Sequence, residues 1–306
     1  MSPEPDRETV WRPSWPCPVG RILGPTRRGP GDPTYRIEGI RHWRGTRTPL
    51  GPATLLIEPR PSGGEVYAAA WGPGAEWAIA QVPDLLGASD DPTGFDPRHP
   101  LLVEAHRRHP HWRFGRTGLV WESLLPAVIE QKVTGQEAFA GFRRIVRRFG
   151  ERAPGPHPDL WMVPSPAQTA AIPSWEWLQA HVDGGRSKTL MHAARVADSL
   201  ERIVGVELTT ADRRLRSLPG IGVWTSAEVR TRALGDADAV SFGDYHIAKD
   251  VGWALTGTPV DDQGLAELLE PWRPHRGRMV ALTALAGAHR PRRGPRMAPR
   301  THLPVR

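Results

Sequence analysis

Cysteine is almost absent from this 306-residue chain, which contains only Cys17. A single thiol excludes an internal disulfide framework and a four-cysteine zinc or iron–sulfur site built from this chain. The histidines do not replace it, because Pro110 interrupts any helix that would align His106, His109 and His111. We therefore predict no metal site.

Long apolar runs are missing as well, and no stretch approaches the length that crosses a bilayer. Residues 1–30 carry proline, tryptophan and acidic residues where a secretory leader has an apolar core. We therefore expect a soluble, cytoplasmic protein with no membrane partner. The chain length predicts two or three compact units.

Lysine is scarce, occurring only at positions 132, 188 and 249, so arginine supplies most of the positive charge. The formal net charge is +7, but residues 288–306 hold six arginines and no acid, which leaves +1 for residues 1–287. This basic, proline-rich tail is predicted to be disordered and to add loose affinity for phosphates.

The order of the predicted elements indicates a mostly α protein with a small N-terminal α+β unit. Short β-prone runs at 35–37, 53–57 and 66–71 are separated by proline and glycine turns, which predicts an antiparallel sheet with a helix over 75–86 across it. The expected divisions are an irregular Pro/Arg-rich arm at 1–33, an α+β domain at 34–115, a helical domain at 116–287 and the tail at 288–306.

Apolar periodicity predicts the helices of the third division. One stripe covers 124–129, and the next helix opens at Thr134 with the Thr-Gly-Gln-Glu spacing of a capping box and ends before Gly150. A tight turn at 131–134 therefore joins two helices. Further helices are predicted over 190–204, 211–217, 223–234, 245–255, 265–269 and 276–288.

The segment Leu218-Pro219-Gly220-Ile221-Gly222 lies between two of these helices. Proline ends the first helix, and the two glycines permit a tight turn with positive φ. Such a turn exposes backbone N–H groups beside a helix N-terminus, where a phosphate can bind. An ordinary helix–helix connection explains the same spacing equally well.

Asp244 opens the next amphipathic helix. Taken alone, its position is typical of an N-cap, which contributes about 1 kcal/mol to stability.

Together, these segments resemble the helix-hairpin-helix DNA glycosylase superfamily, and within it the bacterial 3-methyladenine DNA glycosylase II family. Residues 218–225 match the family's Leu-Pro-Gly-Ile-Gly-x-Trp-Thr hairpin, and Asp244-Tyr245 matches the Asp-Tyr pair that follows. Residues 121–134 resemble its Gln-centred turn, and residues 271–276 resemble its Trp-rich C-terminal motif. The resemblance implies a helix-hairpin-helix glycosylase fold with an N-terminal β domain.

The resemblance also implies a mechanism. The hairpin grips the DNA backbone, the damaged nucleotide flips out of the stack, and the Asp244 carboxylate stabilises the positive charge that builds on the sugar. Gln131 and Lys132 enter the gap left by the base, and a solvated pair at a helix end is the alternative explanation for them. The hairpin residues implied to bind DNA are Leu218, Gly220, Ile221, Gly222 and Thr225.

Trp224 and Tyr245 correspond to walls of the base pocket, where an aromatic ring attracts a cationic alkylated base; with 13 tryptophans in the chain, a core role competes. Two departures bear on the substrate. Glu228 stands where the family has an aromatic residue, and residues 282–285 lack its second tryptophan. The pocket is therefore expected to have lost aromatic surface and gained a carboxylate.

The lyases of the superfamily carry a nucleophilic lysine where this chain has Trp224, so a monofunctional hydrolase is expected. The resemblance implies that the protein is a monomer associated with the nucleoid, and that its partner is duplex DNA containing damaged bases. No cofactor is implied, although a monovalent cation bridging the hairpin and a DNA phosphate is compatible with the motif. Two alternatives remain: a non-catalytic protein that binds damaged DNA, and a glycosylase for deaminated or oxidised bases.

Overall fold

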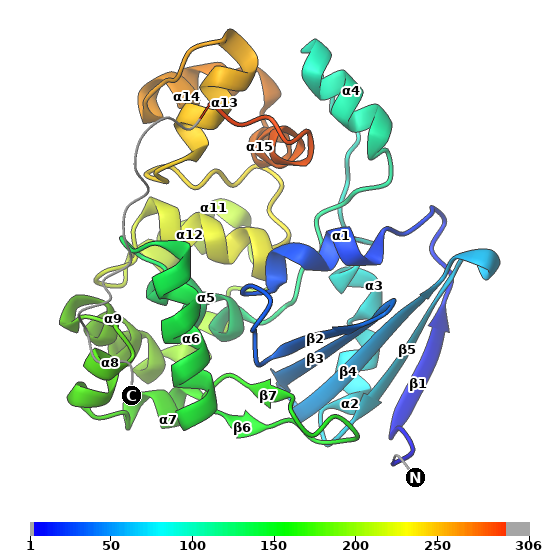
Figure 1. Ribbon diagram of the computed structural model, residues 1–306, viewed down its shortest axis with the longest axis vertical. Coiled ribbons are helices and arrows are strands. Elements are labelled where there is room, and N and C mark those ends of the chain that lie inside the picture. The colour runs from blue at the N-terminus through cyan, green and yellow to red at the C-terminus, as the bar shows by residue number, and fades with distance from the viewer. Residues whose placement is uncertain (1–2, 292–306) are drawn as a thin grey trace.

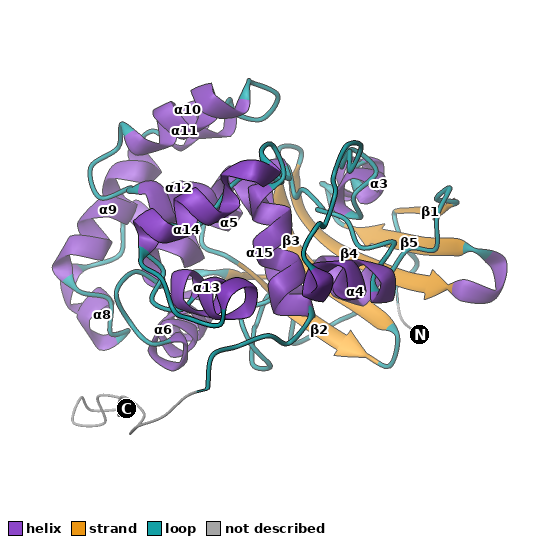
Figure 2. Cartoon of the chain, turned by 90° about the horizontal axis from the view of Figure 1, so that it is seen from above, coloured by secondary structure: helices purple, strands orange, loops and turns teal. Residues whose placement is uncertain are grey.

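A five-stranded antiparallel sheet forms one side of the protein in the computed structural model, which describes residues 3–291, and a helical body forms the other (Figures 1 and 2). The strand order is β1-β5-β4-β3-β2. The bounds are β1 (Arg7–Trp11), β2 (Tyr35–Glu38), β3 (Arg41–Thr48), β4 (Gly51–Arg60) and β5 (Glu65–Trp71). The predicted antiparallel sheet is therefore confirmed.

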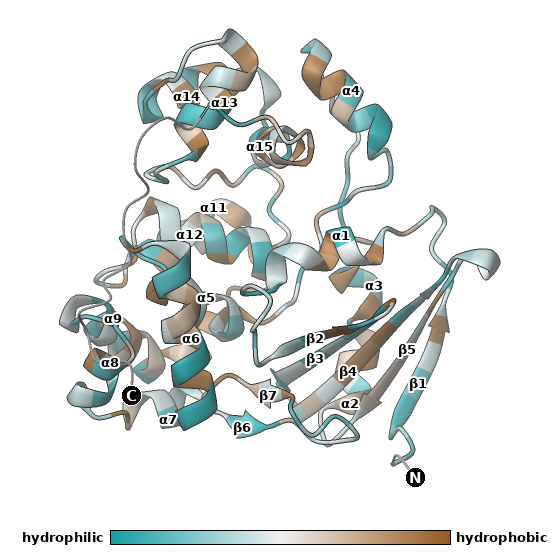
Figure 3. Ribbon diagram, viewed as in Figure 1, coloured by the Kyte–Doolittle hydropathy of each residue, from teal (hydrophilic) through white to brown (hydrophobic). Residues whose placement is uncertain are grey.

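Both faces of the sheet are covered, because side chains alternate along a strand with period 2. On β4, Leu55 and Ile57 face a core shared with α1 (Val19–Leu23), α2 (Ala75–Ala80) and α3 (Val82–Leu85). Leu56 faces the opposite core with Trp43, under the short ribbon of β6 (Glu151–Arg152) and β7 (Trp161–Met162). Figure 3 shows the resulting hydrophobic colouring along β4.

The prediction that residues 1–33 form an irregular arm is wrong. Strand β1 pairs with β5 from Arg7↔Ala70 to Trp11↔Val66, and α1 buries Ile22 and Leu23. The sequence cannot predict this strand, because the strand depends on a tertiary contact. The edge of β5 offers unpaired backbone groups to any nearby extended segment. The local sequence, rich in proline and arginine, does not reveal that edge.

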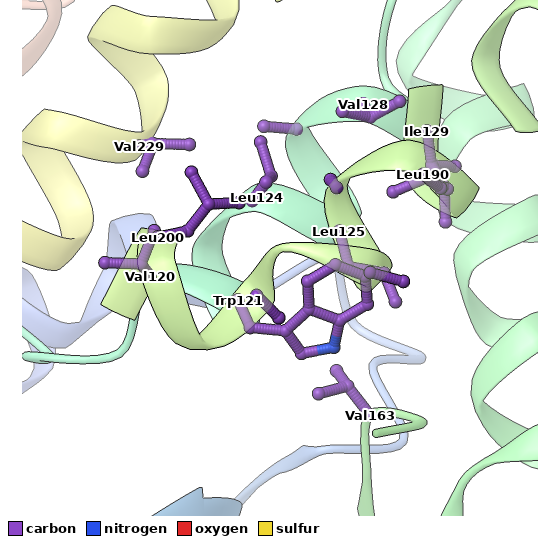
Figure 4. Packing of buried hydrophobic residues seen from close by; sticks show 14 of the residues in the cluster. Val120, Trp121, Leu124, Leu125, Val128, Ile129, Val163, Leu190, Leu200 and Val229 are labelled. Carbon is purple, nitrogen blue, oxygen red and sulfur yellow. The ribbon is translucent and has the colours of Figure 1, made fainter. Parts of the chain in front are cut away.

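The helical body packs around α5 (Val120–Ile129), whose apolar side chains are all buried. Figure 4 shows Leu124 of α5 among Val229 and Leu200 from later helices. The surrounding elements are α6 (Gly135–Phe149), α7 (Pro166–Ala170), α8 (Ser174–Gln179), α9 (Gly184–Arg195), α10 (Ala197–Glu201), α11 (Leu208–Arg216) and α12 (Val223–Val229), the last continued by a π turn at Arg230–Leu234.

A further group of helices lies at the end of the body, formed by α4 (Pro100–Arg108), α13 (Ile247–Thr256), α14 (Asp262–Leu269) and α15 (Arg276–Leu285). This changes the boundary expected near residue 115. Leu102 and Ala105 of α4 pack with Met279 and Leu282 of α15, not with the sheet, so residues 100–108 belong with the C-terminal helices. Most of the predicted disordered tail, 292–306, lies outside the described residues.

Within residues 3–291, no helix is both long and apolar enough to cross a membrane.

Candidate active site

The hairpin between α11 and α12 has the tight geometry that its glycines predict. Gly220 has φ of +85°, and a Cβ added there would lie 1.9 Å from Oγ1 of Thr189 on α9. Ile221 is 4% exposed and anchors the turn in the core. Gly222 is exposed, has φ of −95° and has no neighbouring atom within 4 Å of an added Cβ. Gly220 is therefore required by its backbone conformation and by the packing of Thr189. Nothing within the protein requires a glycine at position 222, where only a bound molecule would meet an added Cβ.

The turn between α5 and α6 is fastened to this hairpin. Nε2 of Gln131 donates to the backbone oxygen of Gly220 at 3.0 Å and to Oγ1 of Thr225 at 2.8 Å. Lys132 is exposed at the tip of the turn and has φ of +55°, in the left-handed region that a non-glycine residue rarely adopts. The structure thus separates the two residues predicted to enter the gap left by the base, which we call the wedge residues. Gln131 is bonded to the hairpin, whereas Lys132 makes no contact with it among the described hydrogen bonds.

Asp244 uses its two carboxylate oxygens differently. Oδ1 accepts the backbone N–H groups of His246 at 2.7 Å and Ile247 at 3.0 Å, at the start of α13. Oδ2 accepts from the indole Nε1 of Trp224 at 3.3 Å. Asp244 can therefore cap α13 and still present a carboxylate oxygen to the site. Oδ1 fixes the side chain, and Oδ2 faces α12, the helix that follows the hairpin.

Tyr245 does not complete an enclosed aromatic wall. Tyr245 is 69% exposed, and its ring packs edge to face against the ring of His246, with 4.9 Å between the ring centroids. The ammonium of Lys249 lies 4.1 Å from the ring centroid and the guanidinium of Arg290 lies 5.9 Å from it. Tyr245 is thus an open aromatic surface flanked by cations, which suits contact with nucleic acid.

Glu228 is not a free carboxylate beside Trp224. Although the two residues share one face of α12, Oε2 of Glu228 accepts from Arg232 at 2.6 Å and Oε1 accepts from the hydroxyl of Ser241 at 2.5 Å. Burial raises the pKa of Glu228, but Arg232, Ser241 and Arg28 more than offset this and hold the pKa below its usual value. The carboxylate that the sequence adds to this region is therefore already occupied by protein groups.

A second, largely buried ion pair lies beside that of Glu228 with Arg232, and no sequence signal predicts it. Nε of Arg28 lies 3.1 Å from Oε1 of Glu130, and the two side chains are 6% and 16% exposed. Arg28 comes from the segment predicted to be irregular. The pairing of Glu228 with Arg232 could have been read from the i,i+4 spacing on a helix, but nothing local links Arg28 to Glu130.

The residues of the Trp-rich C-terminal motif make contacts within the protein. The indole of Trp272 donates to the backbone oxygen of Asp96 at 2.9 Å, and Arg276 forms a charged pair with Asp238 at 2.6 Å. The two contacts join the 3₁₀ turn at Glu270–Trp272 and the first residue of α15 to distant loops, so the motif positions the C-terminal helices.

Other features of the surface lie apart from these residues. A groove of about 580 Å³ is lined by Trp15, Cys17, Arg21 and Trp112 among others, and contains none of the predicted site residues. Within residues 3–291, no group of three or more His, Cys, Asp or Glu side chains is arranged to hold a metal ion.

Comparison with known proteins gives two kinds of match, while no family model matches the chain. The probable bifunctional transcriptional activator/DNA repair enzyme AlkA of Mycobacterium tuberculosis is 31% identical over 218 residues, covering 65% of this chain. This chain spans only about 40% of the length of that relative.

Solved structures match over nearly the whole chain. The 3-methyladenine DNA-glycosylase of Archaeoglobus fulgidus aligns with a TM-score of 0.77 and 17% identity, covering 91% of this chain and 98% of that one. The 8-oxoguanine glycosylase/lyase of Clostridium acetobutylicum, bound to double-stranded DNA, aligns with a TM-score of 0.71 and 14% identity, covering 94% and 97%. At this identity the likeness establishes the fold. The chain therefore has the fold of the helix-hairpin-helix DNA glycosylases and resembles that superfamily, including its AlkA-type enzymes, in both sequence and structure.

Proposed function

We propose that this protein is a monofunctional DNA glycosylase that removes alkylated, 3-methyladenine-type bases from duplex DNA. The observation that carries the proposal is the Asp244 carboxylate, which is fixed by two backbone N–H groups and held 3.3 Å from Trp224 on the helix after the hairpin. The names of the AlkA relative and of the Archaeoglobus fulgidus enzyme support repair of alkylated DNA.

In this mechanism the hairpin at 218–222 binds the phosphate backbone through its exposed turn, and Lys132 enters the space vacated by the flipped base. Trp224 and Tyr245 then contact the flipped base. Cleavage of the N-glycosidic bond leaves positive charge on the deoxyribose, and Asp244 stabilises that charge and orients the attacking water. A cationic alkylated base leaves without being protonated by the protein.

Hydrolysis without strand cleavage is supported by the placement of the lysines. Trp224 occupies the position two residues after Gly222, where the lyases of the superfamily carry their nucleophilic lysine. The ammonium of Lys249 lies over the ring of Tyr245 instead. We expect borohydride to trap no covalent adduct with lesion DNA. An adduct would contradict the monofunctional assignment without affecting the glycosylase assignment.

The experiment that tests the proposal is mass spectrometry of the bases released from DNA treated with a methylating agent. Release of 3-methyladenine is the expected result. The second candidate function is removal of oxidised bases, which is favoured by the fold shared with an 8-oxoguanine glycosylase/lyase and by the lack at position 228 of an aromatic ring that would attract a cationic base. Release of 8-oxoguanine alone from oxidised DNA would replace the first candidate with the second. Tight binding without release of any base would leave a damage-binding protein.

The turn at 131–134, which we call the wedge turn, can be tested through the capping box at Thr134. Its side chain and that of Glu137 cap α6 reciprocally, directly after Gln131 and Lys132. Thr134→Ala is expected to lower the free energy of unfolding by about 1 kcal/mol. It should also weaken binding to DNA containing an abasic-site analogue, because the turn loses its support.

The matched control is Ser165→Ala, which removes the equivalent capping box from α7. Denaturant unfolding should show a similar loss for both variants, whereas only Thr134→Ala should change DNA affinity. Equal affinities would mean that the turn takes no part in DNA binding.

A further inference from the structure

Four charged side chains, one of them buried and three largely buried, connect segments that are far apart in the sequence. Arg28 pairs with Glu130, Arg232 pairs with Glu228, and their side chains are between 6% and 17% exposed. We refer to these four residues as the charge network. It joins the N-terminal segment, the end of α5, helix α12 and the π turn after it.

One end of the charge network lies at the wedge turn. Glu130 directly precedes Gln131, whose amide is bonded to the hairpin. Arg28 is itself held in place, since its backbone N–H donates to Oδ2 of Asp32 at 2.7 Å and its guanidinium donates to the oxygen of Pro25 at 3.2 Å. The turn therefore rests on a charge that the N-terminal segment supplies.

The other end lies at the loop that presents Asp244. Ser241 donates its hydroxyl to Glu228, and its backbone oxygen accepts from the N–H of Asp244 at 3.2 Å. Beyond this contact, the N–H of Gly243 donates to Oδ2 of Asp262 at 2.9 Å. Glu228 thus holds the side of the loop that faces α12, and Asp262 holds the other side.

Electrostatic interactions connect the two ends of the charge network. Burial lowers the pKa of Arg28 and raises that of Glu130, and the opposite charge of the partner acts against the effect of burial in each case. Arg232 interacts with both Glu228 and Glu130, which links the two pairs. Removing one member leaves an opposite charge buried without compensation, and the nearby segments must shift to solvate it.

We propose that the charge network sets the position of Asp244 relative to the wedge turn, with Glu228 and Arg28 as positioning residues. The inference rests on the proposed function, because the turn and Asp244 have these roles only in a DNA glycosylase. It assigns the N-terminal segment a part in the site. It also gives Glu228 a role other than contact with the substrate base.

The test compares Glu228→Gln with Glu122→Gln. Glu122 pairs with Arg44 at 2.6 Å, with side chains 15% and 8% exposed, and bridges the sheet to α5 without contacting the wedge turn or residues 241–244. The two substitutions therefore remove one buried carboxylate charge each. Single-turnover base release and affinity for abasic-site DNA are measured separately, with thermal unfolding as the check on the fold.

For Glu228→Gln we expect base release to slow by about 10²-fold, the cost of a misplacement of about 1 Å. DNA affinity should change by no more than about threefold, because the hairpin and turn still bind. Glu122→Gln should lose similar thermal stability and keep its rate. Arg28→Met should slow release like Glu228→Gln, and Arg28→Lys should recover part of the rate; if Arg28→Met does not fold, the comparison of the two glutamates decides alone.

A double-mutant cycle tests the coupling itself. Gln131→Ala and Glu228→Gln should be non-additive, the double variant losing less activity than the product of the two single losses, because both disturb one connected unit. Additive losses, or equal rates for Glu228→Gln and Glu122→Gln, would overturn the positioning role while leaving the glycosylase proposal intact. If the wild-type protein released no base from any damaged DNA, the proposed function and this inference would both fail.

Discussion

Asp244→Asn is expected to slow single-turnover base release by about 10³-fold, the range found when a group that stabilises transition-state charge is removed. Asparagine keeps an oxygen that can accept the N–H groups of His246 and Ile247, so α13 retains its start. The amide is neutral and cannot stabilise positive charge on the sugar. Quenched-flow measurement of free base from methylated duplex DNA gives the rate.

The matched control is Asp261→Asn. Asp261 caps the next helix by accepting the N–H of Gly264 at 2.8 Å, and it lies outside the group of residues around Trp224. Both variants should unfold at temperatures close to that of the wild type, while only Asp244→Asn loses activity. Unchanged release by Asp244→Asn would reduce Asp244 to a helix cap and remove the basis of the proposed mechanism.

Local sequence signals were sufficient for the parts of the site that lie within single turns. The hairpin at 218–222, the capping box at Thr134 and the start of the helix after Asp244 each depend on residues within a few positions of one another. The mostly α fold with an N-terminal antiparallel sheet was likewise predicted correctly. Periodicity and turn residues specify such elements without reference to the rest of the chain.

The remaining features depend on contacts between distant segments. Strand β1 exists because the edge of β5 is available to it, and α4 belongs with α15 because their apolar faces meet. Arg28 could not be connected to Glu130 by any spacing rule. This matters for the site, because the sequence predicts a carboxylate in the base pocket at Glu228, whereas Arg232 and Ser241 occupy that carboxylate in the structure.

Gly220→Ala is expected to disable the hairpin. Alanine is strained by about 1–3 kcal/mol at positive φ, and its Cβ would lie 1.9 Å from Oγ1 of Thr189, so the turn must also move. In the proposed mechanism the backbone N–H groups of the hairpin bind a phosphate. Displacing them should then weaken DNA affinity by about 10–100-fold, since each charge-assisted hydrogen bond contributes about 1.5–3 kcal/mol. Fluorescence anisotropy with lesion-containing duplex measures the affinity, and denaturant unfolding measures the stability.

Two further variants separate packing from DNA contact. Thr189→Ala combined with Gly220→Ala removes the hydroxyl from the clash and should recover part of the stability, leaving the backbone strain. Gly222→Ala should retain nearly full stability, because its φ of −95° is ordinary and an added Cβ meets nothing within 4 Å. A loss of DNA affinity in this stable variant would place the phosphate against Gly222. Wild-type affinity for both single glycine variants would show that the hairpin is a connection between helices and not a DNA-binding element.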